Sequence, residues 1–156
     1  METRMTARVS VRRAMRSDLA AIRRIEETSF SRPWKSETFD ELLGAPAMEV
    51  LVAVAGAEVA GYAVLVVRER EAELANLAVS GPHRGEGIGQ ALVARAIALC
   101  GGRGARRILL AVRASNRAAI RLYLRYGFRT IGSHGSYYED PPEDACIMLL
   151  TLPEEC

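Results

Sequence analysis

The chain is poor in cysteine, and this limits the structural devices available to it. Its 156 residues include three cysteines, Cys100, Cys146 and Cys156. Their odd number and wide spacing fit neither a disulfide framework nor a zinc ligand set. Cys100 and Cys146 lie in apolar patterns and are expected to be buried thiols, whereas Cys156 at the end of the chain is expected to be exposed. The sequence therefore predicts no metal site and no disulfide.

Long hydrophobic runs are also missing. No run approaches the ~20 apolar residues that cross a bilayer. Residues 1–8 are polar and lack the apolar segment of a signal peptide. We therefore expect a cytoplasmic protein that does not contact membranes.

The chain also lacks a strong excess of either charge. The formal net charge is +2, and Lys35 is the only lysine among the cations. A charge this small does not indicate nucleic-acid binding on its own, so we expect none directly. Arg103, Arg106 and Arg107 form one local basic cluster. This cluster is either a solvated connection between a helix and a strand or a contact for an anionic partner.

Length and patterning predict one α/β domain over residues 1–156, with residues 1–7 flexible. Hydrophobic alternation predicts strands over residues 8–12, 50–55, 59–67, 73–79, 108–112, 128–131 and 145–152. Helical spacing predicts helices over residues 18–26, 36–44, 87–99 and 116–126. Ser17 is expected to cap the first helix, and Gly101 with Gly102 to close the third. This order predicts a single mixed sheet with helices on both faces.

The most informative segment runs from Leu77 to Gln90, where a strand pattern ends and a glycine-dense basic loop opens into a helix. Three glycines at alternate positions, Gly85, Gly87 and Gly89, leave backbone N–H groups uncovered by side chains. The helix that follows adds its positive dipole end and unpaired donors, and Arg84 adds a cation. The segment therefore predicts a pyrophosphate site, with a glycine-rich turn that binds nothing as the alternative.

The loop differs from two common phosphate-binding motifs. No Gly-x-x-x-x-Gly-Lys-Ser/Thr string occurs, and the spacing Gly-x-Gly-x-x-Gly fails at Gln90 or at Leu92. The remaining pattern, Arg84-x-x-Gly87-x-Gly89, resembles the acetyl-coenzyme A loop of the GCN5-related N-acetyltransferase (GNAT) superfamily. The resemblance implies that acetyl-CoA is bound through the loop residues Arg84, Gly85, Glu86, Gly87, Ile88, Gly89 and Gln90.

A second pattern supports the same resemblance. Asn116 follows a buried strand at the start of a helix, and Tyr123 lies two helical turns later on the same face. The unit closes with Gly127 and Phe128. In GNAT enzymes such an Asn binds the pantetheine arm, and such a Tyr lies beside the thioester sulfur. For Tyr123 alone, a buried core tyrosine is the alternative interpretation.

Four shorter segments narrow the resemblance to the RimI subfamily, which acetylates the N-terminal alanine of a small-subunit ribosomal protein. They are residues 30–34, 76–79, 112–116 and 137–138. The resemblance implies that Trp34, Tyr137 and Tyr138 border the incoming N-terminus. For Trp34 taken alone, packing in the core is the slightly favoured interpretation. The resemblance therefore implies a protein substrate, with a small-molecule amine as the alternative.

The resemblance also implies how the reaction proceeds, by direct attack of an amine on the thioester. The backbone of Leu77, Ala78 and Val79 is expected to pair with the pantetheine arm, and the Leu77 N–H to polarise the acetyl carbonyl. Tyr123, with an ordinary pKa of about 10, is expected to protonate the departing sulfur.

The proton acceptor departs from the family pattern. RimI enzymes commonly carry a Glu where this chain has Ala111, which cannot accept a proton. Glu73 lies four residues before Leu77, which predicts that both face the same side of a strand. Our hypothesis is that Glu73 acts as the base through an ordered water. The alternative is an exposed carboxylate near Arg68 or Arg70.

Three functions remain open at this point. The first is an acetyl-CoA-dependent acetyltransferase, without a metal, that acts on a protein N-terminus. The second is the same chemistry on a small-molecule amine. The third is a non-catalytic acyl-CoA-binding module, which Ala111 keeps open. His83 and His134 are treated as solvated loop histidines without partners.

Overall fold

The predicted alternation of strand and helix patterns is confirmed in a computed structural model that describes residues 8–30, 33–139 and 141–153. The expected flexibility of residues 1–7 and the exposure of Cys156 concern residues outside these ranges. The strands are β1 (Val9–Arg13), β2 (Met48–Ala55), β3 (Glu58–Arg68), β4 (Glu71–Val79), β5 (Arg107–Arg113), β6 (Arg129–Tyr138) and β7 (Glu143–Thr151). The helices are α1 (Leu19–Ser29), α2 (Ser36–Gly44), α3 (Ile88–Gly102) and α4 (Arg117–Arg125), with short 3-10 turns η1 (Arg16–Asp18) and η2 (Gly81–His83).

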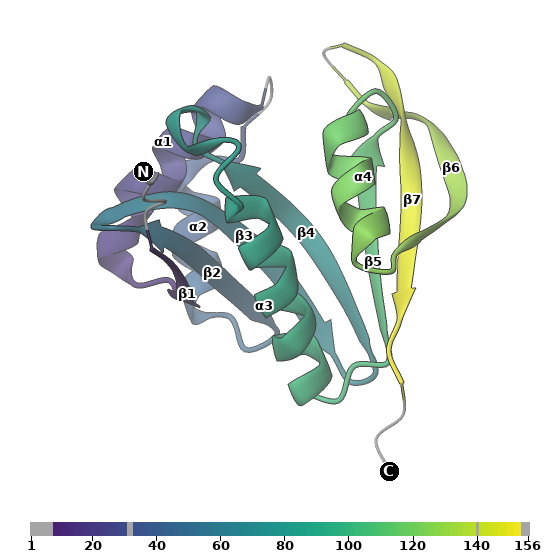
Figure 1. Cartoon of the computed structure of the whole chain (residues 1–156), viewed down its shortest axis with the longest axis horizontal. Helices are drawn as coiled ribbons and strands as arrows, with labels where there is room; N and C mark the ends of the chain where they lie inside the picture. The colour runs from purple at the N-terminus through teal and green to yellow at the C-terminus, as the bar shows by residue number, and fades with distance from the viewer. Residues whose placement is uncertain (1–7, 31–32, 140, 154–156) are drawn as a thin grey trace, which may run out of the picture.

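The strands form one mixed seven-stranded sheet in the order β1-β2-β3-β4-β5-β7-β6. All neighbouring strands are antiparallel except β4 and β5, which are parallel. These two strands pair only where residues 71–73 meet residues 107–109. Beyond that short ladder they diverge, as Figure 1 shows. The divergence leaves the later part of β4 with an unpaired backbone edge.

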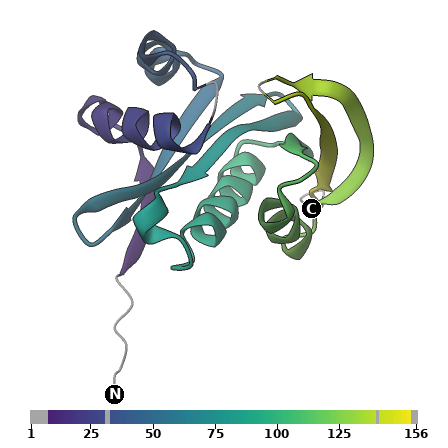
Figure 2. The ribbon, with the colours of Figure 1, turned by 90° about the horizontal axis from the view of Figure 1, so that it is seen from above.

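Helices cover the sheet on both faces, as predicted. Helices α1 and α2 lie on one face, and α3 and α4 lie on the other (Figure 2). Leu65 and Leu92 belong to the core on the α3 side, whereas Ile22 and Phe39 pack on the α1 side. None of the described helices is long and apolar enough to cross a membrane.

A β-bulge in β4 changes which side chains reach each face. Asn76 pairs with Val64 and Leu74 pairs with Leu65, so Ala75 is an extra residue in the strand. The alternation of side chains therefore shifts by one residue at this point. Before the bulge Leu74 packs on the α3 side, and after it Leu77 does.

Two helix boundaries differ from the predictions. Ser17 lies inside η1 and is not the cap of α1. Asp18 organises this turn instead, since its carboxylate accepts the Met15 N–H at 2.7 Å and binds Arg12. Helix α3 continues through both glycines predicted to close it. It ends before Gly104, whose φ of +91° is readily adopted only by glycine.

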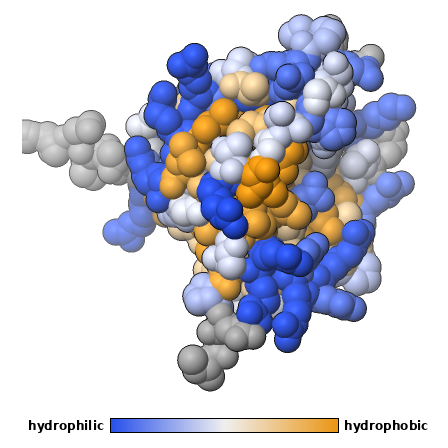
Figure 3. Space-filling model, turned by 90° about the vertical axis from the view of Figure 1, so that its right-hand side faces the viewer, coloured by the Kyte–Doolittle hydropathy of each residue, from blue (hydrophilic) through white to orange (hydrophobic). Residues whose placement is uncertain are grey.

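The edge strand β6 is longer than predicted. Tyr137 and Tyr138 lie in its last residues and not in a loop. The register with β7 shifts between His134 and Tyr138, and Ser136 has a φ of +53°. The irregular pairing explains why no strand alternation is visible there. On this side of the molecule, where β6 leaves Ile131 47% exposed, apolar side chains lie among charged ones (Figure 3).

Candidate active site

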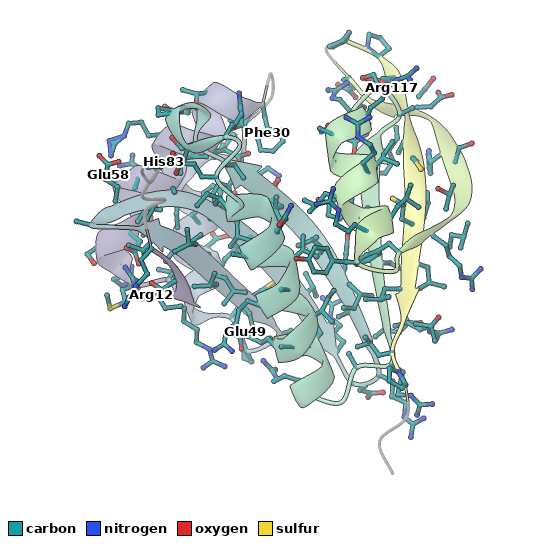
Figure 4. All side chains as sticks on the ribbon, in the orientation of Figure 1. Arg12, Phe30, Glu49, Glu58, His83 and Arg117 are labelled. Atoms are coloured by element: carbon teal, nitrogen blue, oxygen red, sulfur yellow. The ribbon has the colours of Figure 1, made fainter. Side chains whose placement is uncertain are left out.

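A pocket of about 1060 Å³ opens where β4 and β5 diverge. Its walls come from β4, β5, the first turns of α3 and α4, the end of α1 and the end of β6. Phe30 after α1 and Arg117 at the start of α4 lie on opposite sides of this opening (Figure 4). The predicted site residues that line it are Trp34, Glu73, Leu77, Ala78, Val79, Arg84, Gly85, Gly87, Ile88, Gly89, Gln90, Asn116, Tyr123, Tyr137 and Tyr138.

The glycine loop has the backbone that an anion site needs. Gly85 and Gly87 both have a φ of +82°, and Gly87 is the residue that precedes α3. No atom lies within 4 Å of a Cβ built at either glycine, so the backbone there is open. Gly89 differs, because a Cβ there would lie 3.2 Å from Leu122 of α4. Its lack of a side chain therefore also lets α3 and α4 pack closely.

Glu86 is the loop residue that does not line the pocket. Its carboxylate lies 2.9 Å from Nδ1 of His83, and Nε2 of the same ring lies 2.9 Å from Glu58. Figure 4 shows His83 beside Glu58. The prediction that His83 has no partners is therefore wrong. These two carboxylates, Glu86 first, raise the pKa of His83.

The unpaired edge of β4 presents its backbone to the pocket. Leu77, Ala78 and Val79 all line it. The Leu77 N–H donates to Oδ1 of the neighbouring Asn76 at 3.1 Å. Because that partner is a local side chain and not β3, the N–H is directed away from the ladder. It is therefore within reach of a ligand.

Asn116 and Tyr123 come from α4, as the spacing predicts. Asn116 precedes the helix, and its Oδ1 accepts the Ala119 N–H at 3.1 Å. Tyr123 is 6% exposed and packs edge-on against Phe128. Burial, and then the neighbouring Tyr138, raise the pKa of Tyr123. Its hydroxyl has no hydrogen-bond partner among the described residues, so it is free for a ligand in the pocket.

Trp34, Tyr137 and Tyr138 are three of the aromatic side chains that border the pocket. Tyr138 packs edge-on against Tyr137, and the Arg113 guanidinium lies 4.5 Å from the centre of the Tyr138 ring. Burial raises the pKa of Tyr138 to about 12. The Trp34 ring lies 5.6 Å from Phe39 of α2, so Trp34 serves the core and the pocket together.

Glu73 and Ala111 lie on neighbouring strands at the base of the pocket. The prediction that Glu73 shares a face with Leu77 is wrong, because the bulge at Ala75 reverses the alternation between them. Glu73 instead pairs with Leu109 of β5, and side chains of such partners point to one face. Ala111, two residues after Leu109, faces that same side. The exposed carboxylate of Glu73 thus lies on the same side of the sheet as Ala111, the position where RimI enzymes commonly carry a Glu.

The exposure of Glu73 agrees with its alternative interpretation as an exposed strand carboxylate, although the expected arginine contacts are not formed. Within the described ranges, Glu73 forms no ion pair with Arg68 or Arg70. The basic cluster near α3 behaves as a solvated connection, since Arg103 pairs with Glu49 and Arg107 with Glu71. Cys100 is buried as predicted, whereas Cys146 is only half-buried.

Sequence reasoning missed several residues of the pocket, and Glu26 is the buried carboxylate among them. This carboxylate is 1% exposed at the end of α1 and lines the pocket. Its oxygens accept hydrogen bonds from Asn76 and Tyr62 and from the backbone of Trp34. The available signal was its place four residues after Ile22, on the apolar face of the helix.

Comparison with known proteins agrees with this geometry. Residues 19–128 match the family model described as Acetyltransferase (GNAT) family. The [ribosomal protein bS18]-alanine N-acetyltransferase of Escherichia coli (strain K12) is 36% identical over 138 residues, which cover 87% of this chain and 93% of that protein. The crystal structure of the ribosomal-protein-S18-alanine N-acetyltransferase from Escherichia coli matches with a TM-score of 0.87 and 31% identity, covering 96% of this chain and 97% of that one.

An archaeal structure is similar to a comparable extent. Ard1 from Thermoplasma volcanium matches with a TM-score of 0.84 and 27% identity over 94% of this chain and 99% of that one. The family match covers most of the chain and includes the glycine loop, Asn116 and Tyr123. The chain belongs to the GNAT family of acetyltransferases.

Proposed function

We propose that the protein transfers the acetyl group of acetyl-CoA to the α-amine of a protein N-terminus. The substrate that the named relatives favour is the N-terminal alanine of ribosomal protein bS18. The observation that carries the proposal is the pocket itself. It joins an open glycine loop, an unpaired strand edge and a buried tyrosine to an aromatic border.

The residues present fit acetyl-CoA. The positive-φ glycines Gly85 and Gly87, with Arg84 and the start of α3, supply donors and positive charge for a pyrophosphate. The free edge of β4 can pair with an amide-containing arm, and Asn116 has its Nδ2 donor still available after capping α4. When bound, acetyl-CoA supplies an acetyl group activated as a thioester.

Two groups of the chain act on the acetyl centre. The Leu77 N–H donates to the carbonyl oxygen, where negative charge increases as an amine attacks. Tyr123 holds a proton at Oη and donates it to the departing sulfur. Its raised pKa keeps this proton in place at neutral pH, and burial penalises a bare thiolate in the same pocket.

The attacking α-amine requires little help to lose its proton. An α-amine has an ordinary pKa of about 7.7–8.0, whereas that of a lysine is about 10.4. A larger fraction of α-amines is therefore neutral near pH 7, and a weak base is sufficient. We propose Glu73 as this base, acting through water from the strand beside Ala111.

The proposal is tested with short peptides that begin with alanine and contain one lysine. One peptide has a free α-amine, and a matched peptide has this amine blocked. Incubation with acetyl-CoA and mass spectrometry are expected to show acetylation of the first peptide at the α-amine and no acetylation of the second. Transfer to the lysine of the blocked peptide at a comparable rate would refute N-terminal specificity.

Ala111 favours a second candidate, a module that binds acyl-CoA without catalysis. This candidate predicts that acetyl-CoA binds and that neither peptide is acetylated. Calorimetric titration with acetyl-CoA, run beside the peptide assay, separates the two functions.

A further inference from the structure

Glu26 is a buried charged group that the proposed reaction does not use. No described arginine, lysine or histidine forms an ion pair with it. Burying a carboxylate without a cation costs free energy unless hydrogen bonds compensate. A side chain of this kind at the wall of a catalytic pocket therefore calls for an explanation.

Three donors from three different parts of the fold converge on Glu26. The Trp34 N–H donates to Oε2 at 2.8 Å, and Nδ2 of Asn76 donates to Oε1 at 2.9 Å. The Tyr62 hydroxyl also donates to Oε1, and it lies 3.2 Å from Asn76 Nδ2. Burial, and then Glu26, raise the pKa of Tyr62, so this hydroxyl stays a donor. The carboxylate thus joins the α1–α2 connection to β3 and β4.

These contacts fix the orientation of the Asn76 amide. With Nδ2 held by Glu26 and Tyr62, Oδ1 is turned toward the Leu77 N–H, which it accepts at 3.1 Å. The reversed amide would place its oxygen against the carboxylate and its NH₂ group against the Leu77 N–H. Both of those contacts are repulsive, so Glu26 selects a single orientation.

We propose that Glu26 is a positioning residue that acts through Asn76 on the Leu77 N–H. Asn76 Oδ1 holds this N–H toward the pocket before the thioester binds and shares it with the carbonyl oxygen afterwards. The inference rests on the proposed function in one respect, the assignment of the Leu77 N–H as donor to that oxygen.

A double-mutant cycle tests this coupling. Glu26→Gln and Asn76→Ala are each expected to lower kcat by about tenfold, within the usual range of a pairwise coupling. KM for acetyl-CoA and for the peptide should change by less than about twofold, because the ground-state contacts remain. In the Asn76→Ala background, Glu26→Gln should have no further effect on kcat. Glu27→Gln, at an exposed site on the same helix, is the matched control.

Amide NMR supplies a readout that does not depend on turnover. The Leu77 N–H resonance should shift in Glu26→Gln and in Asn76→Ala but not in Glu27→Gln. If the wild type acetylates no peptide, the proposed function fails while this shift still tests the coupling. If Glu26→Gln does not fold, Asn76→Ala alone must show both the kcat loss and the shift.

Three results would overturn the proposal. One is a raised KM for the peptide with unchanged kcat in Glu26→Gln, which would mean that Glu26 binds the amine directly. Another is an equal loss of kcat from Glu26→Gln in both backgrounds, which would make the role merely structural. The third is an unshifted Leu77 resonance.

Discussion

Tyr123 and Glu73 carry the two proton transfers of the proposed reaction, and their surroundings differ. Tyr123 is almost fully buried and packs against Phe128, whereas Glu73 is an exposed residue of β4. Burial keeps Tyr123 neutral until charge develops beside it. Glu73 lies in contact with solvent and can pass a proton to water. Tyr123 is therefore suited to hold a proton until the sulfur departs, and Glu73 is suited to pass one to water.

Replacing Tyr123 with Phe removes only the hydroxyl. We expect kcat to fall by about a hundredfold or more, the usual contribution of a general acid. Acetyl-CoA affinity, measured by calorimetry, should stay within about twofold, because the ring still fills its site. Tyr126→Phe, at the residue that follows this helix and outside the pocket, is the control. Full activity in Tyr123→Phe would remove this residue from the mechanism.

Replacing Glu73 with Gln tests the base. Turnover of an α-amine peptide is expected to fall by only about tenfold near pH 7, because roughly a tenth of the α-amines are already neutral there. The difference from wild type should narrow as the pH rises above about 8, because the amine then loses its proton without assistance. Glu71→Gln, at the start of the same strand, is the control. Equal rates for wild type and Glu73→Gln at every pH would contradict the assignment.

His83 makes stability depend on pH with a defined sign. Glu86 and Glu58 raise its pKa in the folded protein above the ordinary value of about 6.5. The stabilisation is therefore complete below the unfolded pKa and is lost as the pH rises through the folded one. We expect His83→Gln to lower Tm most near pH 5.5 and least near pH 9. A Tm difference that grows with pH would contradict this reading.

Side chains differ in how well the sequence predicts them, and sequence separation is the reason. Asn116 and Tyr123 are predictable because one helix fixes their spacing. The place of Glu26 in the pocket is not predictable, because its partners Tyr62 and Asn76 lie 36 and 50 residues away in the sequence. Glu73 was identified in the pocket, but the argument from strand alternation failed at the Ala75 bulge.

Elements follow the same rule. The β4–loop–α3 unit can be predicted from the sequence, because glycine spacing and hydrophobic periodicity are local features. The bulge in β4 and the full length of β6 cannot be predicted in this way, since each is set by pairing with another strand. The true end of α3 was also misplaced, because Gly101 and Gly102 adopt helical conformations and Gly104 does not.

Gly61 of β3 tests how the elements around the loop fit together. A Cβ there would lie 2.8 Å from Ala78 O and 2.9 Å from Ile88 Cγ2. Gly61→Ala should therefore lower the free energy of unfolding by about 1–3 kcal/mol, as overpacking does. It should also weaken acetyl-CoA binding, because Ala78 and Ile88 both line the pocket.

The control for this prediction is Gly102→Ala in α3, where nothing lies within 4 Å of the added Cβ. That variant is expected to gain about 0.5–1 kcal/mol, since alanine favours a helix more than glycine does. Denaturant unfolding measures both variants. A Gly61→Ala protein as stable as wild type would mean that β3, β4 and α3 are less closely fitted than the distances indicate.

At the scale of the whole molecule, the site results from one interruption in the sheet. The strands β4 and β5 pair over three residues and then separate, while helices on both faces support the opening. Backbone donors of the loop and strand lie in the opening together with Tyr123, Glu73 and the aromatic border. The mixed sheet and its helices were predictable from the order of elements. The separation of two neighbouring strands was not, because no local pattern encodes it.

In the proposed function, this opening serves transfer of acetyl from acetyl-CoA to a protein α-amine. The most direct measurement is peptide-mapping mass spectrometry of full-length ribosomal protein bS18, with a free N-terminal alanine, after incubation with the protein and acetyl-CoA. We expect one added acetyl group, on the alanine α-amine, and none on the lysines of the same molecule. Acetylation of lysines in preference to the N-terminus, or no acetylation while acetyl-CoA binds, would contradict the proposed function.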